Sequence, residues 1–201
     1  DAIKLFKSDS DCIIVLGSIW KSDIDVIFDP LSKILEKYPF IQIIIVPHEI
    51  KENEIKIIKE FWVKKNFITD LFSESKDFSD ARVMIIDKVG LLAKIYRISK
   101  IAFVGGGFGR NVHNVLEPVV LGNAVLFGPQ NTKSYEAVQL LNRKGAIEVK
   151  NSSEFTERLI ELIENNEYRQ TLCSNAMSFV NENLQATKKT IEIFKDKGYI
   201  K

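Results

Sequence analysis

Short runs of mostly apolar residues recur along the chain, and segments with helical periodicity separate them. Six runs are expected to be strands, and most end at glycine, proline or aspartate: residues 12–16, 41–46, 82–86, 101–104, 124–127 and 146–149. Apolar positions three and four apart predict helices between them, over residues 25–38, 49–65, 91–99, 112–121 and 134–144. From about residue 153 onward a polar-rich helical tail is expected.

This alternation predicts an α/β domain with a doubly wound parallel sheet. Strands that are apolar on both faces are typical of parallel sheets covered by helices. Ligands of such sheets bind outside the carboxyl ends of the strands. That rule selects the segments directly after the apolar runs, which are Gly17-Ser18, Pro47-His48, residues 87–90, residues 105–114 and residues 128–131. The segment 65–80 is expected to be irregular, with a surface loop over residues 73–80.

Composition narrows the class of protein further. The chain has 201 residues, of which 45% are hydrophobic and 27% charged, as in ordinary globular domains. Its 28 Lys and Arg nearly cancel 27 Asp and Glu, so no overall field attracts nucleic acid or an anionic membrane. The longest apolar runs reach about half of the roughly 20 residues that a transmembrane helix needs. The isolated Cys12 and Cys173 fit a reducing compartment and argue against structural zinc.

The first residues do not resemble a signal peptide, and the chain lacks a starting methionine. We therefore expect it to be a fragment or a processed product.

Glycine is concentrated at one place in the chain. Six of the ten glycines fall between Gly105 and Gly128, and four of these follow a predicted strand and precede a predicted helix. Such a loop can present backbone N–H groups to a phosphate near a helix N-terminus, although a tight turn without a ligand is the alternative. The loop lacks the third glycine of G-x-G-x-x-G, and no G-K-[ST] occurs, so NAD-binding and P-loop interpretations are disfavoured.

Four further side chains near these loops are candidates for binding. Asn114 and Glu117 share one helical face, where the carboxylate could accept ribose hydroxyls, or the pair could form a capping box. His48 and His113 both sit at predicted strand ends and are either structural or functional. No spacing in the chain supports a metal site, a Ser-His-Asp triad or a carboxylate pair. Trp20 and Trp62 are expected to be packing residues.

Residues 104–118 read VGGGFGRNVHNVLEP, and residues 122–129 read GNAVLFGP. These segments resemble the C-terminal half of the 3-deoxy-D-manno-octulosonic acid (Kdo) transferases of lipopolysaccharide synthesis, which carry a glycine-rich segment, His-Asn-x-Leu-Glu-Pro and Phe-Gly-Pro. Residues 17–20 resemble the family's Gly-Ser-Thr segment, and residues 87–92 its Asp-Thr-x-Gly-Glu-Leu segment. Order and spacing agree over about residues 10 to 185.

The resemblance implies the Rossmann-like C-terminal domain of a GT-B glycosyltransferase. Residues 1–201 would form the donor-binding domain of an enzyme that moves Kdo from CMP-Kdo to a lipid A precursor at the cytoplasmic face of the bacterial inner membrane. The acceptor site, a glutamate general base and the membrane-associating segment would lie in an N-terminal half outside this chain. No catalytic residue, metal or cofactor is therefore expected here, and the chain is expected to be soluble and inactive alone.

The resemblance also implies roles for particular residues. Asn114 and Glu117 would hold CMP, the turn at Val89-Gly90 would offer N–H groups to its phosphate, and other candidates would border the same cleft. The full set of candidate nucleotide-binding residues is Ser18, Pro47, His48, Val89, Gly90, Gly106, Gly107, His113, Asn114 and Glu117.

The sequence departs from the family pattern at three places. Pro47-His48-Glu49 stands where the family often has Pro-Arg-His, so a phosphate-facing cation is missing unless His48 replaces it. Leu91 and Ile19 replace the family's Glu and Thr. Two alternatives stay open: a GT-B glycosyltransferase domain that uses a UDP-sugar, and a nucleotide-binding or interaction module without catalysis.

Overall fold

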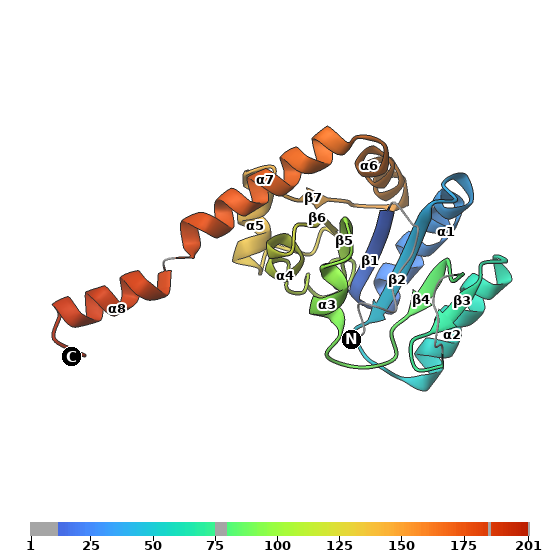
Figure 1. The fold of residues 1–201 in the computed structure, drawn as a ribbon, viewed down its shortest axis with the longest axis horizontal. Helices are drawn as coiled ribbons and strands as arrows, with labels where there is room; N and C mark the ends of the chain where they lie inside the picture. Colours follow the sequence, from blue (N-terminus) through green and yellow to red (C-terminus); the bar gives the residue numbers. More distant parts are fainter. Residues whose placement is uncertain (1–11, 75–79, 185, 201) are drawn as a thin grey trace.

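A parallel sheet forms the centre of the computed structural model, which describes residues 12–74, 80–184 and 186–200. Within these residues the sheet has seven strands in the order β3-β4-β2-β1-β5-β6-β7 (Figure 1). All pairings are parallel. The strands are β1 (Cys12–Ile19), β2 (Ile41–Pro47), β3 (Thr69–Leu71), β4 (Val83–Ile85), β5 (Ile101–Val104), β6 (Ala124–Phe127) and β7 (Ile147–Glu148).

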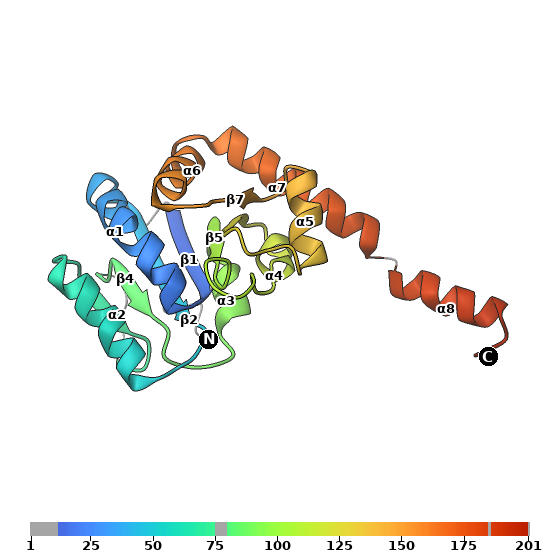
Figure 2. The same ribbon diagram turned by 180° about the vertical axis from the view of Figure 1, so that it is seen from behind.

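Helices cover both faces of the sheet, as the views from opposite sides show (Figures 1 and 2). One face packs against α1 (Lys21–Lys37), α2 (Glu52–Lys64) and α6 (Ser152–Glu164). The other packs against α3 (Leu92–Tyr96), α4 (Leu116–Val120), α5 (Tyr135–Asn142) and α7 (Asn166–Asn183). Helix α8 (Ala186–Asp196) follows α7 and extends away from the body of the domain.

Strand β1 shows why the sequence predicted this architecture. Ile14 and Leu16 pack on the α1 side, whereas Ile13 and Val15 pack on the α3 side, and none is more than 7% exposed. A strand buried on both faces needs apolar residues at consecutive positions, which is the pattern of residues 12–16. The predicted doubly wound α/β fold is confirmed.

The order in which strands are added to the sheet reverses between β1 and β5. From β1 the chain builds outward through β2 to β4 and β3, and then returns to the other side of β1 to add β5, β6 and β7. The turn after β1 and the glycine-rich loop after β5 therefore lie side by side at the carboxyl edge. Their backbones touch: Gly105 N–H donates to Gly17 O at 2.9 Å, and a Cβ on Gly105 would lie 2.3 Å from Ser18 O.

Several element boundaries differ from the predictions. The segment 65–80, predicted to be irregular, contains the short edge strand β3, whose residues are only half-buried and form no apolar run. Helix α1 begins at Lys21, four residues before the predicted start at residue 25, and β1 continues to Ile19. The predicted helices 49–65, 91–99 and 134–144 are each shorter in the structure, and the predicted tail consists of α6, α7 and α8.

The largest difference concerns the predicted helix over residues 112–121, of which only α4 is helical. Val112 N–H donates to Gln130 O, and His113 N–H donates to Gly105 O. These bonds to other loops replace the bonds that a helix would make. The segment before α4 is consequently an extended arm laid against the loops after β5 and β6.

One buried carboxylate joins α1 to the glycine-rich loop. Asp23, in the first turn of α1, is fully buried. Its Oδ2 accepts Trp20 N–H and Gly106 N–H, both at 2.8 Å, and its Oδ1 accepts Phe108 N–H at 3.2 Å. Burial raises the pKa of the Asp23 carboxyl, and these three hydrogen bonds oppose that rise.

Replacing this carboxylate with an amide tests its role. In Asp23→Asn the amide NH2 would face at least one of the backbone N–H donors, so we expect a loss of about 2–4 kcal/mol in the free energy of unfolding in urea. Asp25→Asn on the same helix is the matched control. Asp25 is exposed and pairs with Lys21, so its loss should be about 0.5 kcal/mol or less. Equal losses in the two variants would contradict this role for Asp23.

Candidate functional site

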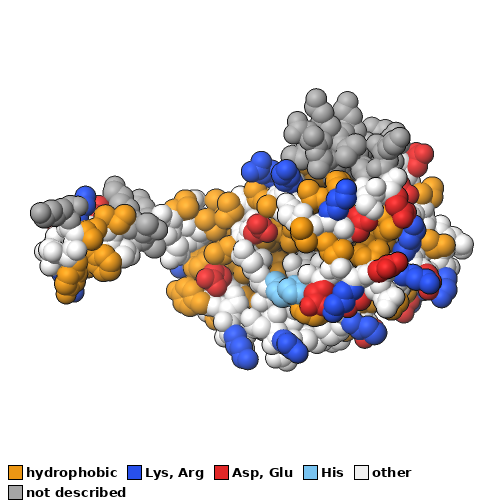
Figure 3. All heavy atoms as spheres, turned by 90° about the horizontal axis from the view of Figure 1, so that it is seen from below, with side chains coloured by type: hydrophobic (Ala, Val, Ile, Leu, Met, Phe, Trp, Pro, Cys, Tyr) orange, Lys and Arg blue, Asp and Glu red, His pale blue; other side chains and the backbone are white. Residues whose placement is uncertain are grey.

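An open cavity of about 760 Å³ lies at the carboxyl edge, where β1, β2 and β5 end. Three segments line it: the start of α1, the turn after β2 and the arm that follows the glycine-rich loop. Figure 3 shows histidine side chains at the surface of the molecule, beside acidic and basic side chains. The lining residues are Trp20, Lys21, Ser22, Glu49, Lys51, Gly109, Arg110, Asn111, Val112 and His113.

Three aromatic rings from these segments stack on one another. The ring of His48 lies 4.2 Å from that of Trp20 and 4.3 Å from that of His113, with interplanar angles of 25° and 11°. Trp20 Nε1–H donates to His113 Nε2 at 2.7 Å. The ring of His48 thus stacks on a hydrogen-bonded Trp20–His113 pair. The backbone N–H of His48 donates to Ile19 O at 3.0 Å, which ties the turn after β2 to the end of β1.

The surroundings of the His113 ring favour its neutral form. Burial lowers its pKa most, the nearby charge of His48 lowers it further, and the Asp23 carboxylate partly opposes both effects. A neutral imidazole offers one donor and one acceptor, whereas the protonated ring offers only donors. Because Nε2 accepts from Trp20, the neutral form matches the hydrogen bond that the structure contains.

The charges around the cavity favour an anionic ligand. Lys21 pairs with Asp25, and Lys51 pairs with Glu49 and Glu54. The guanidinium of exposed Arg110 has no ion-pair or hydrogen-bond partner among the residues that the structure describes. Helix α1 has 17 residues and begins at the cavity, so its positive dipole end adds to the field of Arg110.

Asn114 and Glu117 come directly after the lining segment 109–113, Asn114 before α4 and Glu117 in its first turn. Asn114 Oδ1 accepts Leu116 N–H at 3.0 Å, and the N-cap of α4 is Val115, so the capping box considered from the sequence is not formed. In the described parts of the chain the Glu117 carboxylate accepts no hydrogen bond. Burial raises the pKa of Tyr96, and the charge of Glu117 raises it further. The Tyr96 hydroxyl fills the space beside Gly17, which places Glu117 near the end of β1.

The glycines of the loop have a packing role. Gly106 has a φ of +92° and donates its N–H to Asp23, so this N–H is directed inward rather than toward a ligand. A Cβ on Gly107 would lie 2.5 Å from Gly128 N. The close approach of these backbones accounts for glycine at both positions without a bound phosphate. Their role in nucleotide binding stays a prediction.

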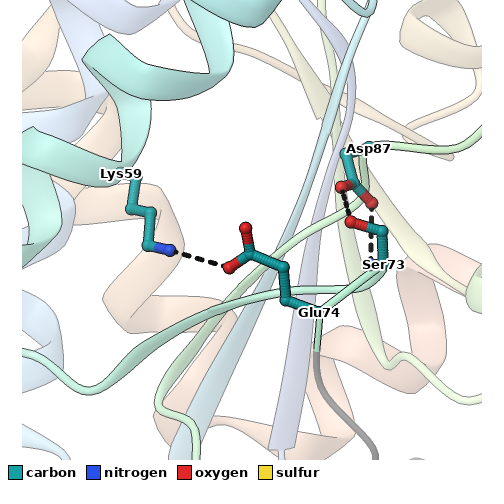
Figure 4. A network of polar contacts seen from close by, with 4 residues as sticks. All are labelled: Lys59, Ser73, Glu74 and Asp87. Atoms are coloured by element: carbon teal, nitrogen blue, oxygen red, sulfur yellow. Dashed lines mark hydrogen bonds and ion pairs between the residues drawn. The ribbon is translucent and has the colours of Figure 1, made fainter.

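The loop after β4 has a polar network at its start (Figure 4). Asp87 accepts Ser73 N–H at 3.0 Å and also binds the Ser73 hydroxyl, while Lys59 pairs with Glu74 at 3.1 Å. Val89 is 86% exposed, and Gly90 has a φ of +81°. Neither residue is among those that line the cavity. The chain returns from this turn to the end of β1, because Leu92, two residues after Gly90, would lie 3.3 Å from a Cβ on Gly17.

The structure therefore brings together some of the candidates and not others. Ser18, with a φ of +55°, lies at the end of β1 beside Trp20, while His48 and His113 join the ring stack. Pro47 is buried at the end of β2. Asn114 is exposed on the arm, and Val89-Gly90 precede α3, whose Leu92 lies against Gly17 at the end of β1. Whether these residues bind a nucleotide stays a prediction.

Sequence reasoning missed three contributors to this site: Asp23, Arg110 and the hydrogen-bonding role of Trp20. Aspartate is common in the first turn of a helix, so Asp23 could have indicated that α1 begins near residue 21. The spacing of apolar residues instead predicted a start at residue 25. Among the described residues no three His, Cys, Asp or Glu side chains group as metal ligands would. No helix in the same residues is long and apolar enough to cross a bilayer.

Curated proteins similar to the chain are Kdo transferases. A 3-deoxy-D-manno-octulosonic acid transferase from Aquifex aeolicus is 33% identical over 154 residues, which cover 75% of this chain and 41% of the relative. One from Chlamydia trachomatis serovar A is 29% identical over 195 residues, covering 96% of this chain and 44% of the relative. The chain thus spans less than half the length of these relatives. No family model matches it.

Solved structures agree on the fold. The C-terminal CMP-Kdo binding domain of WaaA from Acinetobacter baumannii superposes with a TM-score of 0.80 at 20% identity, covering 89% of this chain and 95% of that one. An Anabaena HepE structure in complex with UDP-glucose gives 0.63 at 14% identity, covering 94% of this chain and 49% of that one. The sheet and its helices are those of the C-terminal domain of GT-B glycosyltransferases, as predicted.

The lowered pKa of His113 predicts a pH dependence of stability. The unfolded chain takes up a proton near the ordinary value of 6.5, whereas the folded chain takes it up only at lower pH. Below about pH 6.5 the unfolded state therefore binds more protons, and stability falls as the pH drops toward the folded pKa. We expect the melting temperature to fall more between pH 7 and pH 5.5 for the unmodified chain than for His113→Gln. Parallel curves for the two proteins would contradict this assignment.

Proposed function

The chain is a relative of the 3-deoxy-D-manno-octulosonic acid transferases, and from this relationship we propose that it forms the donor-binding half of such an enzyme, with CMP-Kdo as the donor. The complete protein would transfer Kdo to a lipid A precursor at the cytoplasmic face of the bacterial inner membrane. The acceptor site and the general base would lie in an N-terminal half beyond residues 1–201. Membrane contact would be made through that half as well.

The observation that carries this proposal is the chemistry of the cavity where β1 and β5 end. It combines the N-terminus of α1 with Arg110, which has no partner among the described residues, and both suit a phosphate. Glu117 does not line the cavity but lies near Tyr96, whose hydroxyl abuts Gly17 at the end of β1, and no described residue donates to its carboxylate. A carboxylate accepts hydrogen bonds from two ribose hydroxyls but repels a phosphate. We therefore place the ribose at Glu117 and the phosphate toward Arg110, which supplies the cation that is missing after Pro47.

The reaction follows from this placement. The acceptor hydroxyl attacks the anomeric carbon of Kdo, and the base in the other half takes the hydroxyl proton. The bond from the anomeric carbon to the phosphate oxygen breaks, and CMP leaves with the electron pair. Arg110 and the dipole of α1 stabilise the negative charge that develops on the phosphate. The side chains of this domain thus bind the leaving group, and the acceptor is bound and deprotonated by the other half.

Helix α8 supports the proposed two-half organisation. It extends away from the domain in Figures 1 and 2 and carries exposed Ile191, Ile193 and Phe194, which are 42%, 51% and 45% exposed. Leu184, just before it, is 69% exposed. We infer that these side chains pack against the rest of the full-length protein. Interfaces between domains of one chain bury about 600–1,500 Å², which one such helix and the cavity rim could provide.

Calorimetric titration of the chain with nucleotides tests the proposal. We expect CMP to bind more tightly than UDP, and we expect no Kdo transfer when the chain alone is mixed with CMP-Kdo and a lipid A precursor. Tighter binding of UDP would favour a UDP-sugar enzyme of the same fold. Binding of neither nucleotide would favour an interaction module, and product formation would place the base within this chain.

Removing the Glu117 carboxylate tests the ribose contact. In Glu117→Ala we expect CMP binding to weaken by about 1–3 kcal/mol, because the ribose hydroxyls lose a charged acceptor in a partly desolvated site. The urea midpoint should stay nearly unchanged, since no described residue donates to this carboxylate. Glu157→Ala, at an exposed position on α6, is the matched control and should not affect binding. A falling midpoint with unchanged affinity would show that Glu117 is structural.

A further inference from the structure

The hydrogen bond from the Trp20 indole to His113 Nε2 fixes which ring nitrogen of His113 is an acceptor. We propose that Trp20 is a positioning residue: its indole N–H holds His113 as the neutral Nδ1–H tautomer, so that Nδ1–H can donate to a phosphate oxygen of the nucleotide. The second part of this inference rests on the proposed function, whereas the first part concerns the free protein.

The tautomer follows from the donor inventory of the two rings. An indole N–H can only donate, so His113 Nε2, at 2.7 Å from Trp20 Nε1, must be the acceptor. A neutral imidazole that accepts at Nε2 carries its proton on Nδ1. Free histidine in water prefers the opposite tautomer, with the proton on Nε2. The Trp20 donor therefore selects the form that is the minor one in solution.

Several charged groups surround the ring and decide its protonation. Asp23 on α1 favours the protonated form, while His48 and burial disfavour it. Lys21, Glu49, Lys51 and Arg110 line the same cavity. Protonating Nε2 would also place two donors against each other. The stack, the hydrogen bond and the burial thus act together to keep the ring uncharged.

The Nδ1 edge of the ring is the one available to a ligand. The backbone N–H of His113 donates to Gly105 O at 3.0 Å, and the ring atom Cδ2 lies toward Gly106, 3.1 Å from where a Cβ would stand. Among the residues that the structure describes, Nδ1 has no hydrogen-bond partner, and the side chain lines the cavity. A donor that faces the same cavity as Arg110 is suited to an anionic oxygen, and a phosphate has three such oxygens to offer.

The tautomer can be read directly by ¹H–¹⁵N correlation NMR of the ¹⁵N-histidine-labelled chain near pH 8, with His113→Gln used to assign the signals. We expect His113 to show a protonated Nδ1 and an unprotonated Nε2. In Trp20→Phe, which keeps an aromatic ring in the stack but removes the donor, we expect the Nε2–H tautomer and a higher pKa of His113. The pKa should rise because the neutral ring loses a hydrogen bond that stabilised it.

Trp62→Phe is the matched control. Trp62 is buried on the α1 face, and its indole N–H has no acceptor in the described residues, so the same substitution removes no hydrogen bond. The His113 signals should be those of the unmodified chain. An Nε2–H tautomer of His113 in the unmodified chain, or an unchanged tautomer in Trp20→Phe, would overturn the positioning role.

Calorimetry with CMP and cytidine tests the ligand contact. Because only CMP has a phosphate, Trp20→Phe should weaken CMP binding about tenfold and leave cytidine binding nearly unchanged. Equal weakening of both ligands would overturn the phosphate contact and assign the ring stack to the nucleoside. If the unmodified chain bound neither ligand, the proposed function and the phosphate contact would both fail, and the NMR result would still decide the positioning role.

Discussion

A buried carboxylate that has no cationic partner among the described residues holds the carboxyl edge of this sheet together. Asp23 accepts one N–H from its own helix and two from the glycine-rich loop after β5, across the point where the sheet reverses its direction of growth. A charge this deep is tolerable only when several donors solvate it, and backbone donors can do so only in a fixed geometry. The start of α1, the orientation of Trp20 and the path of the loop are therefore set by one side chain.

The candidate site is a consequence of that junction. With the backbones after β1 and β5 in contact, the ring of Trp20 comes within hydrogen-bond distance of His113, and His48 covers both from the end of β2. The same arrangement opens a cavity beside the N-terminus of α1 and, within the described parts of the chain, leaves Arg110 without a partner. The glycines serve this geometry by allowing close backbone approach, and the cation, the helix dipole and the imidazole then supply the recognition of an anion.

The sequence predicted the architecture because its signals are local. A run such as residues 12–16 is apolar at every position because both faces of the strand are buried, so pattern alone identifies the strand and its environment. The helix expected over residues 112–121 failed for a non-local reason: its first residues bond to Gly105 and Gln130 instead of to each other. Edge strand β3 was not predicted, because its half-buried residues Thr69–Leu71 form no apolar or alternating pattern. The role of Asp23 could not be predicted, because an acidic residue near a helix start does not indicate that its carboxylate accepts the distant N–H groups of Gly106 and Phe108.

The most direct test of the account is a crystal structure of this chain soaked with CMP. The account predicts that the nucleotide lies where β1 and β5 end, with its ribose hydroxyls at Glu117 and its phosphate between His113 Nδ1 and Arg110. Density for CMP anywhere that leaves Trp20, His113 and Glu117 without contact would contradict the central claim that the junction held by Asp23 builds the nucleotide site.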